Sequence, residues 1–316
     1  SDCIKYWQVK PPAVMKTISK FPSDSSNNNA VKNSHGSTYH QLQTENGVPI
    51  VRWLVLQRIC QNRKQAAIKC SSKLVRINHQ ECTALAQLVH DYDQIEIDGI
   101  LIEHHQPIRH VYYVLNKPRG CLSSRRNMKQ IKGGGTVVDH RPTIYDYIPE
   151  KDRPYANSIG RLDYDTTGLM IFTSDGVLCD RLANPRYKVA KIYRCTLRTP
   201  EPLSDEAINQ LQGAGVKLPH ARGAIVHGKA WNIVNNENPE NGAVVDLQIF
   251  GGYTHQVKHM MALVNRPLRL LHRRVFANLE LPSDLKEGEC RAMSHEEIDD
   301  LLKLAFQQQN ELQPGY

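Results

Sequence analysis

The most informative stretch of this 316-residue chain is Ser158-Ile-Gly-Arg-Leu-Asp-Tyr-Asp-Thr-Thr-Gly-Leu-Met-Ile-Phe-Thr-Ser-Asp-Gly176. Gly160 and Gly168 permit tight backbone turns on either side of Asp163. The apolar run Leu169–Phe172 predicts a short buried strand, which we expect to end at the Asp-Gly turn pair that closes the stretch. A carboxylate is therefore expected on a constrained loop beside a rigid element, an arrangement suited to chemistry that needs accurate placement.

The segment around Asp163 reads Gly-Arg-Leu-Asp-x-x-Thr-x-Gly-Leu and closely resembles the central motif of the RsuA/RluB group of pseudouridine synthases, which act on ribosomal RNA. A lone Asp commonly stabilises a turn, but a motif of this length favours a functional carboxylate. The resemblance implies isomerisation of uridine to pseudouridine, for which the base must first leave its stack. Asp163 would act as nucleophile or as base at the ribose, and the sequence leaves both routes open. Arg161 would fix the motif loop or contact the displaced RNA strand.

Two later segments resemble the second and third motifs of the same family and follow in the same order. The segment Asn184–Cys195 carries Tyr193 at the family's active-site tyrosine, and Gly252–Met261 carries Lys258 at its basic active-site position. The resemblance implies that Tyr193 offers a ring face to the extruded uracil and a hydroxyl to the proton on carbon five. Lys258 would keep the carboxylate ionised. The alternatives are a core aromatic residue and a solvated lysine on a helix face.

The third segment also predicts a helix with two different faces. One face is apolar, and the other carries basic or titratable side chains; they comprise Val257, Met260, Met261 and Val264 on the first and His255, Lys258 and His259 on the second. We assign His255 and His259 to RNA binding. Their spacing resembles that of zinc ligands, but the glutamate of the H-E-x-x-H pattern is absent. No metal and no organic cofactor is expected.

A small RNA-binding domain is predicted upstream of these motifs, over residues 49–108. Helical spacing of Val51, Leu54, Val55 and Ile59 and a capping box of Asn62 with Gln65 predict two helices, and residues 74–77 and 94–97 alternate like strands. The stretch resembles the αL-type RNA-binding domain, with the basic RNA-contacting candidates Arg63, Lys64, Lys69 and Lys73. The chain has Ser72-Lys73 and Asn78-His79 where that family usually has glycines. A solvated basic helix face is the alternative.

Composition bounds the class of protein. Forty Lys and Arg against 32 Asp and Glu give a formal charge of +8, which favours a polyanionic partner such as structured RNA. Residues 1–48 are rich in Asn and Ser and predict a flexible extension. The scattered cysteines and the lack of a long apolar run favour a protein of the cytoplasm with no membrane partner, and an organelle matrix is the alternative. We also expect a monomer.

The sequence thus predicts an α+β protein: an extension over 1–48, an αL-type domain over 49–108, and a catalytic domain over 109–316 with a mixed, largely antiparallel sheet flanked by helices. We expect site-specific action on structured RNA, in particular ribosomal RNA. Two other classes remain open at this point. One is a glycoside-cleaving hydrolase that uses Asp163 and Asp165 as a carboxylate pair. The other is a non-catalytic RNA-binding or ribosome-assembly protein with the same fold.

Overall fold

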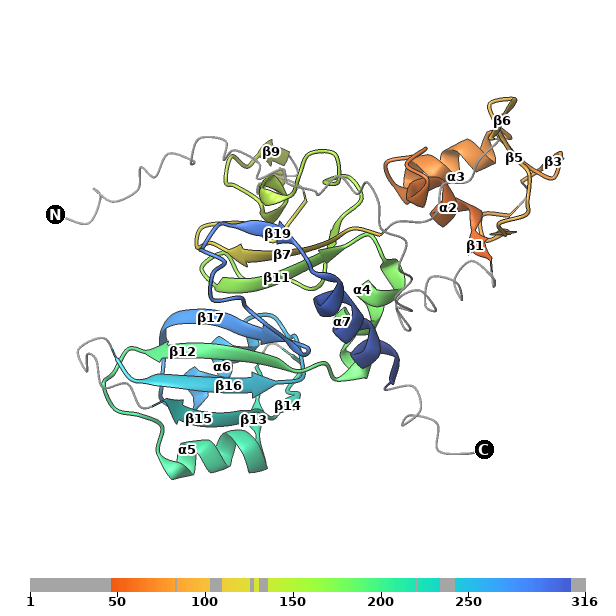
Figure 1. Ribbon diagram of the computed structural model, residues 1–316. Helices are drawn as coiled ribbons and strands as arrows, with labels where there is room; N and C mark the ends of the chain where they lie inside the picture. The colour runs from red at the N-terminus through yellow and green to blue at the C-terminus, as the bar shows by residue number, and fades with distance from the viewer. Residues whose placement is uncertain are drawn as a thin grey trace, which may run out of the picture. The chain divides into compact units, whose positions relative to one another are not determined.

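The structure is a computed structural model that describes residues 47–82, 84–102, 110–125, 128–130, 136–219, 221–233 and 242–307 (Figure 1). Almost all of the predicted extension, residues 1–46, lies outside the described residues, as do parts of the loops around 126–135 and 234–241. No helix within the described ranges combines the length and apolar character that a membrane crossing needs.

Residues 47–102, which we call the small module, hold two short helices and a four-stranded antiparallel sheet. The helices are α2 (Ile50–Leu56) and α3 (Arg63–Ser71). The sheet has the order β3-β2-β5-β6, and a further pair joins β1 to β4; the strands are β1 (Val48–Pro49), β2 (Val75–Ile77), β3 (Gln80–Glu81), β4 (Leu88–Val89), β5 (Ile95–Ile97) and β6 (Ile100–Ile102). A hydrophobic cluster drawn only from residues 48–97 forms its core.

The prediction that the small module begins with two helices is confirmed, but some of the residues assigned to the first helix were wrong. Helix α2 ends at Leu56, so Ile59 lies beyond it, and the residues that α2 buries include Trp53, which the predicted stripe left out. Asn62 caps α3 by accepting from the backbone N–H of Gln65, as predicted. The Gln65 side chain, however, accepts from the N–H of Gln61 and not from that of Asn62.

Residues 110–307, which we call the large region, are built on a mixed sheet with the strand order β15-β16-β12-β17-β11-β7-β19. The strands are β7 (Tyr112–Lys117), β11 (Thr167–Thr173), β12 (Lys191–Leu197), β15 (Lys229–Ile233), β16 (Val244–Ile249), β17 (Leu268–Phe276) and β19 (Cys290–Ala292), with β10 (Asn157–Ser158) on β11 and β18 (Leu279–Glu280) on β17. Among the described pairings, β11 with β17 is parallel and the others are antiparallel. The predicted α+β class and largely antiparallel sheet are confirmed.

Helices cover the two halves of this sheet on different faces (Figure 1). Helices α4 (Gly176–Ala183) and α7 (His295–Gln307) pack on the half formed by β7 and β11. Helix α6 (Gln256–Leu263) and the short α5 (Asp205–Asn209) pack on the half formed by β12 and its neighbours. Apolar side chains on both faces explain why the central strands are nearly fully buried.

The two halves meet where β11 runs beside β17, and Gly168 makes this contact possible. Its φ is +106°, and a Cβ at this position would lie 2.3 Å from the carbonyl oxygen of Arg273. A side chain would push the two strands apart, because neither backbone can rotate away. The glycine therefore fixes the distance between the loop that precedes β11 and the strand β17.

The predicted strand Leu169–Phe172 is confirmed as the centre of β11, but the predicted turn after it is wrong. Asp175 is the N-cap of α4 and accepts from the backbone N–H groups of Val177 and Leu178. An Asp-Gly pair suits a turn and a helix start equally well. Here the apolar residues that follow continue at helical spacing, which selects the helix.

Two further pairs of short strands in the large region form antiparallel ribbons. Strands β8 (Met128–Gln130) and β9 (Thr136–Val138) pair with each other, as do β13 (Val216–Lys217) and β14 (Ile225–Val226). Both ribbons lie outside the order of the main sheet.

Candidate active site

Three separate elements bring the candidate catalytic residues together. Asp163 lies on the loop between β10 and β11, Tyr193 lies in β12, and Lys258 lies in α6. The Lys258 Nζ is 3.0 Å from Asp163 Oδ2 and 2.5 Å from Asp165 Oδ1. Residues 95 positions apart in the sequence thus share one cluster of charges, as the sequence predicted for Asp163 and Lys258.

The Lys258 ammonium is held charged by this arrangement. Burial lowers the pKa of Lys258, but the hydrogen bonds and charges of Asp165 and Asp163 outweigh burial, so the net pKa lies above the usual lysine value. Burial likewise raises the pKa of Asp165, and its hydrogen bond with Lys258 more than reverses this, leaving the pKa below its usual value. Lys258 therefore stays protonated throughout the neutral range and offers a cation to both carboxylates.

A pocket opens beside the ion pair. Its wall includes Asp163, Tyr193 and His255 together with polar and apolar residues from the neighbouring elements; these are Arg161, Leu162, Thr166, Ile249, Gly252, Tyr253, Gln256, Val257 and Leu271. Tyr193 is 7% exposed, so its ring belongs to the core and reaches the pocket with little of its surface. Asp163 is about a quarter exposed at its side chain and is therefore accessible to a ligand in the pocket. Lys258 is not among the residues that line the pocket and reaches it through its contact with Asp163.

His255 is a second basic side chain in contact with Asp163. Its Nε2 lies 3.5 Å from Asp163 Oδ1, and the contact is an ion pair only when the ring is protonated. His255 has a left-handed backbone conformation and precedes the first turn of α6. Its ring centroid is 6.2 Å from that of His259. In the described part of the chain no group of three or more His, Cys, Asp or Glu side chains is arranged to hold a metal, and the predicted lack of a metal requirement stays a prediction.

The loop that carries Asp163 is held in place by hydrogen bonds from a buried lysine. Lys117 ends β7 and is completely buried; its Nζ donates to the carbonyl oxygens of Thr166 at 2.8 Å and Pro118 at 3.0 Å, and more weakly to that of Tyr164 at 3.4 Å. Burial lowers the pKa of Lys117 to about 8, against the opposing charges of Cys121, Asp165 and Asp163. The buried ammonium thus fixes the backbone on the C-terminal side of Asp163.

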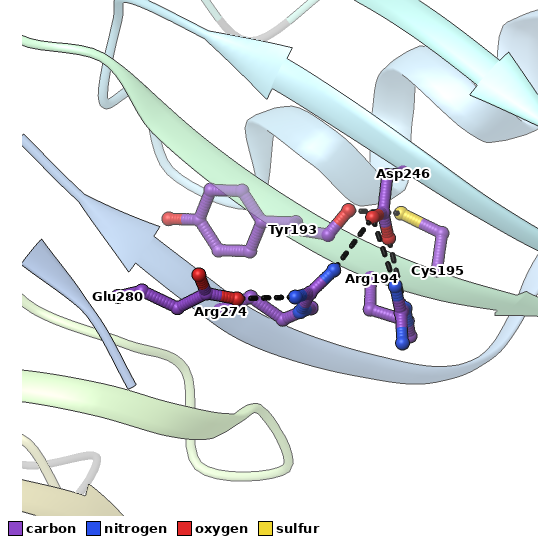
Figure 2. Close-up of polar contacts among 6 residues, drawn as sticks. All are labelled: Tyr193, Arg194, Cys195, Asp246, Arg274 and Glu280. Carbon is purple, nitrogen blue, oxygen red and sulfur yellow. Dashed lines mark hydrogen bonds and ion pairs between the residues drawn. The ribbon is translucent and has the colours of Figure 1, made fainter. Parts of the chain in front are cut away.

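The strand β12, which carries Tyr193, is anchored by a network of ion pairs that begins at the next residue, Arg194 (Figure 2). Asp246 of β16 is 2% exposed and accepts two hydrogen bonds from Arg194, at 2.9 and 3.0 Å, and one from Arg274 of β17 at 3.0 Å. Arg274 also pairs with Glu280. A bidentate contact of this kind has a fixed geometry. It locks β12 to both neighbouring strands at the residue next to Tyr193.

The predicted RNA-binding residues fall into two groups. Arg161 and His255 line the pocket, and His259 follows on the same helix as Lys258. The basic residues of the small module lie on α3 and the turn after it. Lys69 pairs with Asp98 at 2.7 Å and Lys73 pairs with Glu81 at 3.0 Å, whereas the side chains of Arg63 and Lys64 are exposed. Their proposed contacts with RNA stay predictions.

Sequence reasoning missed three residues of this site. Asp165 was considered only as half of a hydrolase pair, although it shares Lys258 with Asp163. Lys117 and Arg273 are buried in strands, where a charged residue gives no sign from spacing alone that its side chain points inward. For Lys117, the sequence did offer one signal: it ends a strand of aromatic and β-branched residues and is followed directly by Pro118.

Comparison with known proteins agrees with this geometry. Residues 111–263 match a family described as RNA pseudouridylate synthase. The chain is 30% identical over 244 residues to ribosomal large subunit pseudouridine synthase B of Bacillus subtilis, covering 77% of this chain and 91% of that protein. The chain belongs to the RNA pseudouridine synthase family. Ribosomal small subunit pseudouridine synthase A of Escherichia coli K12 is 31% identical over 215 residues, with 68% of this chain and 83% of the relative covered.

A solved structure supports the same assignment. The crystal structure of a pseudouridylate synthase superposes with a TM-score of 0.52 at 26% identity and covers 80% of this chain and 99% of the other. This RNA pseudouridine synthase therefore shares its fold and most of its length with its relatives. The glycosidase alternative loses support, because such an enzyme needs one carboxyl with a raised pKa as its acid, whereas the hydrogen bond from Lys258 holds the pKa of Asp165 below its usual value.

Proposed function

We propose that this pseudouridine synthase isomerises specific uridines of ribosomal RNA, with Asp163 as the central carboxylate. The observation that carries the proposal is the contact of Asp163 with Lys258 at a pocket that Tyr193 also lines. The relatives named above are ribosomal large and small subunit pseudouridine synthases, which supports ribosomal RNA as the substrate class. The subunit and the position are set by the folded shape that the RNA presents.

Each residue has a distinct proposed role in the isomerisation. The bond from ribose to the uracil nitrogen breaks, the base turns, and a new bond forms from ribose to carbon five, which then loses its proton. Asp163 attacks or deprotonates the ribose, and Lys258 keeps it ionised and oriented. Tyr193 lies against the base and takes part in moving the proton from carbon five. Since one proton leaves carbon and one joins nitrogen, no net proton is consumed.

We propose that basic side chains bind the RNA outside the pocket. Arg161, His255 and His259 contact the RNA around the extruded nucleotide, and Arg63, Lys64, Lys69 and Lys73 of the small module contact the phosphate backbone. We further propose three parts to the chain: an extension over 1–48, an RNA-binding domain over 49–108, and the catalytic domain over 109–316. The separate hydrophobic core within 48–97 supports this division. A cytoplasmic monomer without a cofactor is the form we propose.

The rival is a protein that binds RNA and assists ribosome assembly without turnover. Unmodified ribosomal RNA is incubated with the wild type and with Asp163→Ala, and pseudouridine is mapped at single-nucleotide resolution. Our proposal requires new pseudouridine at one or a few positions with the wild type and none with the variant, while both bind the RNA. RNA binding by both proteins with no pseudouridine from either would support the rival.

A further inference from the structure

Arg273 of β17 is a buried charge for which the described residues supply no acidic partner. It is 1% exposed and is the largest fully buried side chain among the described residues. Its Nε donates to the carbonyl oxygen of Leu169 at 2.8 Å, and its Nη2 lies 3.1 Å from Met170 Sδ. The guanidinium also sits over the Phe276 ring, 5.0 Å from the centroid. No described Asp or Glu forms an ion pair with it, although buried charges are usually paired.

The position of Arg273 connects this charge to the active site. In the antiparallel pairing of β12 with β17, Arg273 is directly opposite Tyr193, and Leu271 is directly opposite Cys195. Directly opposite residues project their side chains from the same face with Cβ atoms roughly 5 Å apart. Leu271 and Tyr193 both line the pocket, so Arg273 follows on the pocket side of its strand.

The electrostatics of the pair agree with this placement. Burial lowers the pKa of Arg273, and the charge and hydrogen bonding of the Tyr193 hydroxyl act in the opposite direction. Arg274, the next residue, points to the opposite face, where Asp246 and Glu280 pair with it. The chain thus supplies carboxylates to the arginine that faces away from the pocket and leaves the arginine beside Tyr193 with carbonyl, thioether, ring and hydroxyl neighbours.

We propose that Arg273 is a positioning residue for Tyr193: it fixes the tyrosine oxygen at the pocket wall and stabilises negative charge on it. This rests on the proposed role of Tyr193 in proton transfer. The Tyr193 hydroxyl passes its proton, directly or through water, to the released uracil nitrogen; the resulting phenolate then accepts the proton from carbon five, which restores the hydroxyl and balances the protons. A carboxylate beside Arg273 would neutralise the guanidinium and weaken this effect. The lack of an ion-pair partner among the described residues then has a functional reason.

The competing explanation is that Arg273 only joins the sheet halves, since its contact with Leu169 ties β17 to β11. A double-mutant cycle separates the two explanations. Single-turnover rates are measured by release of tritium from carbon five of uracil in RNA, for the wild type, Arg273→Met, Tyr193→Phe and the double variant. RNA affinity and thermal unfolding are measured alongside.

We expect Arg273→Met to slow the wild type by about 10- to 100-fold, a usual range for acid–base assistance, with RNA affinity changed less than about twofold. In the Tyr193→Phe background the same change should cost almost nothing further. Arg274→Met is the matched control, and its effect should be equal in both backgrounds. If Arg273→Met unfolds, Arg273→Lys takes its place in the cycle, since it keeps a charge but loses the fork of donors.

Equal losses from the Arg273 change in both backgrounds would overturn the proposal and leave a structural role. That outcome is distinct from failure of the proposed function. An inactive wild type, or a Tyr193→Phe variant as fast as the wild type, would remove the role of Tyr193 itself and with it the role of Arg273.

Discussion

The packing of Gly168 against β17 predicts a large and specific loss of stability for Gly168→Ala. Alanine at a φ of +106° stores conformational strain of about 1–3 kcal/mol. Its Cβ would also meet the backbone of Arg273, with the carbonyl oxygen 2.3 Å away and the nitrogen 2.7 Å away. Overpacking of this kind adds about 1–3 kcal/mol, because backbone atoms cannot rotate aside as a side chain can.

Gly160→Ala provides a matched control in the same motif. Gly160 has a φ of +77°, but a Cβ there would meet nothing within 4 Å. It should therefore show only the conformational cost, about 1–2 kcal/mol. The difference between the two variants isolates the close approach of β11 to β17 from the effect of a positive φ.

The two variants are compared by urea denaturation and by thermal unfolding. We expect the free energy of unfolding of Gly168→Ala to lie about 2 kcal/mol or more below that of Gly160→Ala. For a domain of this size, that difference corresponds to a melting temperature lower by about 4–8 °C. Equal stability of the two variants would show that the sheet halves do not approach as closely as the structure indicates.

Three further predictions concern charged groups. Lys258→Gln should lower the single-turnover rate by about 100-fold or more, because Asp163 loses the cation that contacts and orients it; a rate within about tenfold of the wild type would contradict this. The pKa of Lys117 is about 8 against about 10.5 in the unfolded chain, so folding releases its proton between these values. The stability of the wild type relative to Lys117→Met should therefore rise by about 3 kcal/mol from pH 7 to pH 10.5 in urea denaturation, and a flat or falling difference would be inconsistent with a buried ammonium. Asp246→Asn should lower the free energy of unfolding in urea by about 2 kcal/mol or more, since it leaves two arginines without their buried carboxylate. Glu280→Gln, at the exposed end of the network, should lower it by less than about 1 kcal/mol, and equal losses for the two variants would contradict this.

The catalytic motif was readable from the sequence because its parts are local. Gly160, Asp163 and Gly168 lie within nine residues, and the order of the later motifs placed Tyr193 and Lys258 at family positions. That these residues share one site depends on contacts between β12, α6 and the loop before β11, which spacing alone does not give. The resemblance supplied this information, and the contact of Lys258 with Asp163 agrees with it.

The supporting residues could not be predicted, for a physical reason. Lys117 and Arg273 carry charges that sequence patterns normally assign to solvent, yet both are buried, and backbone carbonyl oxygens accept hydrogen bonds from their charged groups. Which carbonyls are available depends on the tertiary course of the chain. The Asp-Gly pair at 175–176 failed for a related reason, because its local signal fits both a turn and a helix start, and packing of α4 on β11 makes the choice.

The central claim is that Asp163 gives this chain its activity on RNA. The most direct measurement compares pseudouridine maps of ribosomal RNA from cells that have the protein, cells that lack it, and cells that carry Asp163→Asn at equal abundance. The account predicts that one or a few pseudouridines disappear without the protein and return with the wild type but not with Asp163→Asn. An identical map in all three, or restoration by Asp163→Asn, would contradict it.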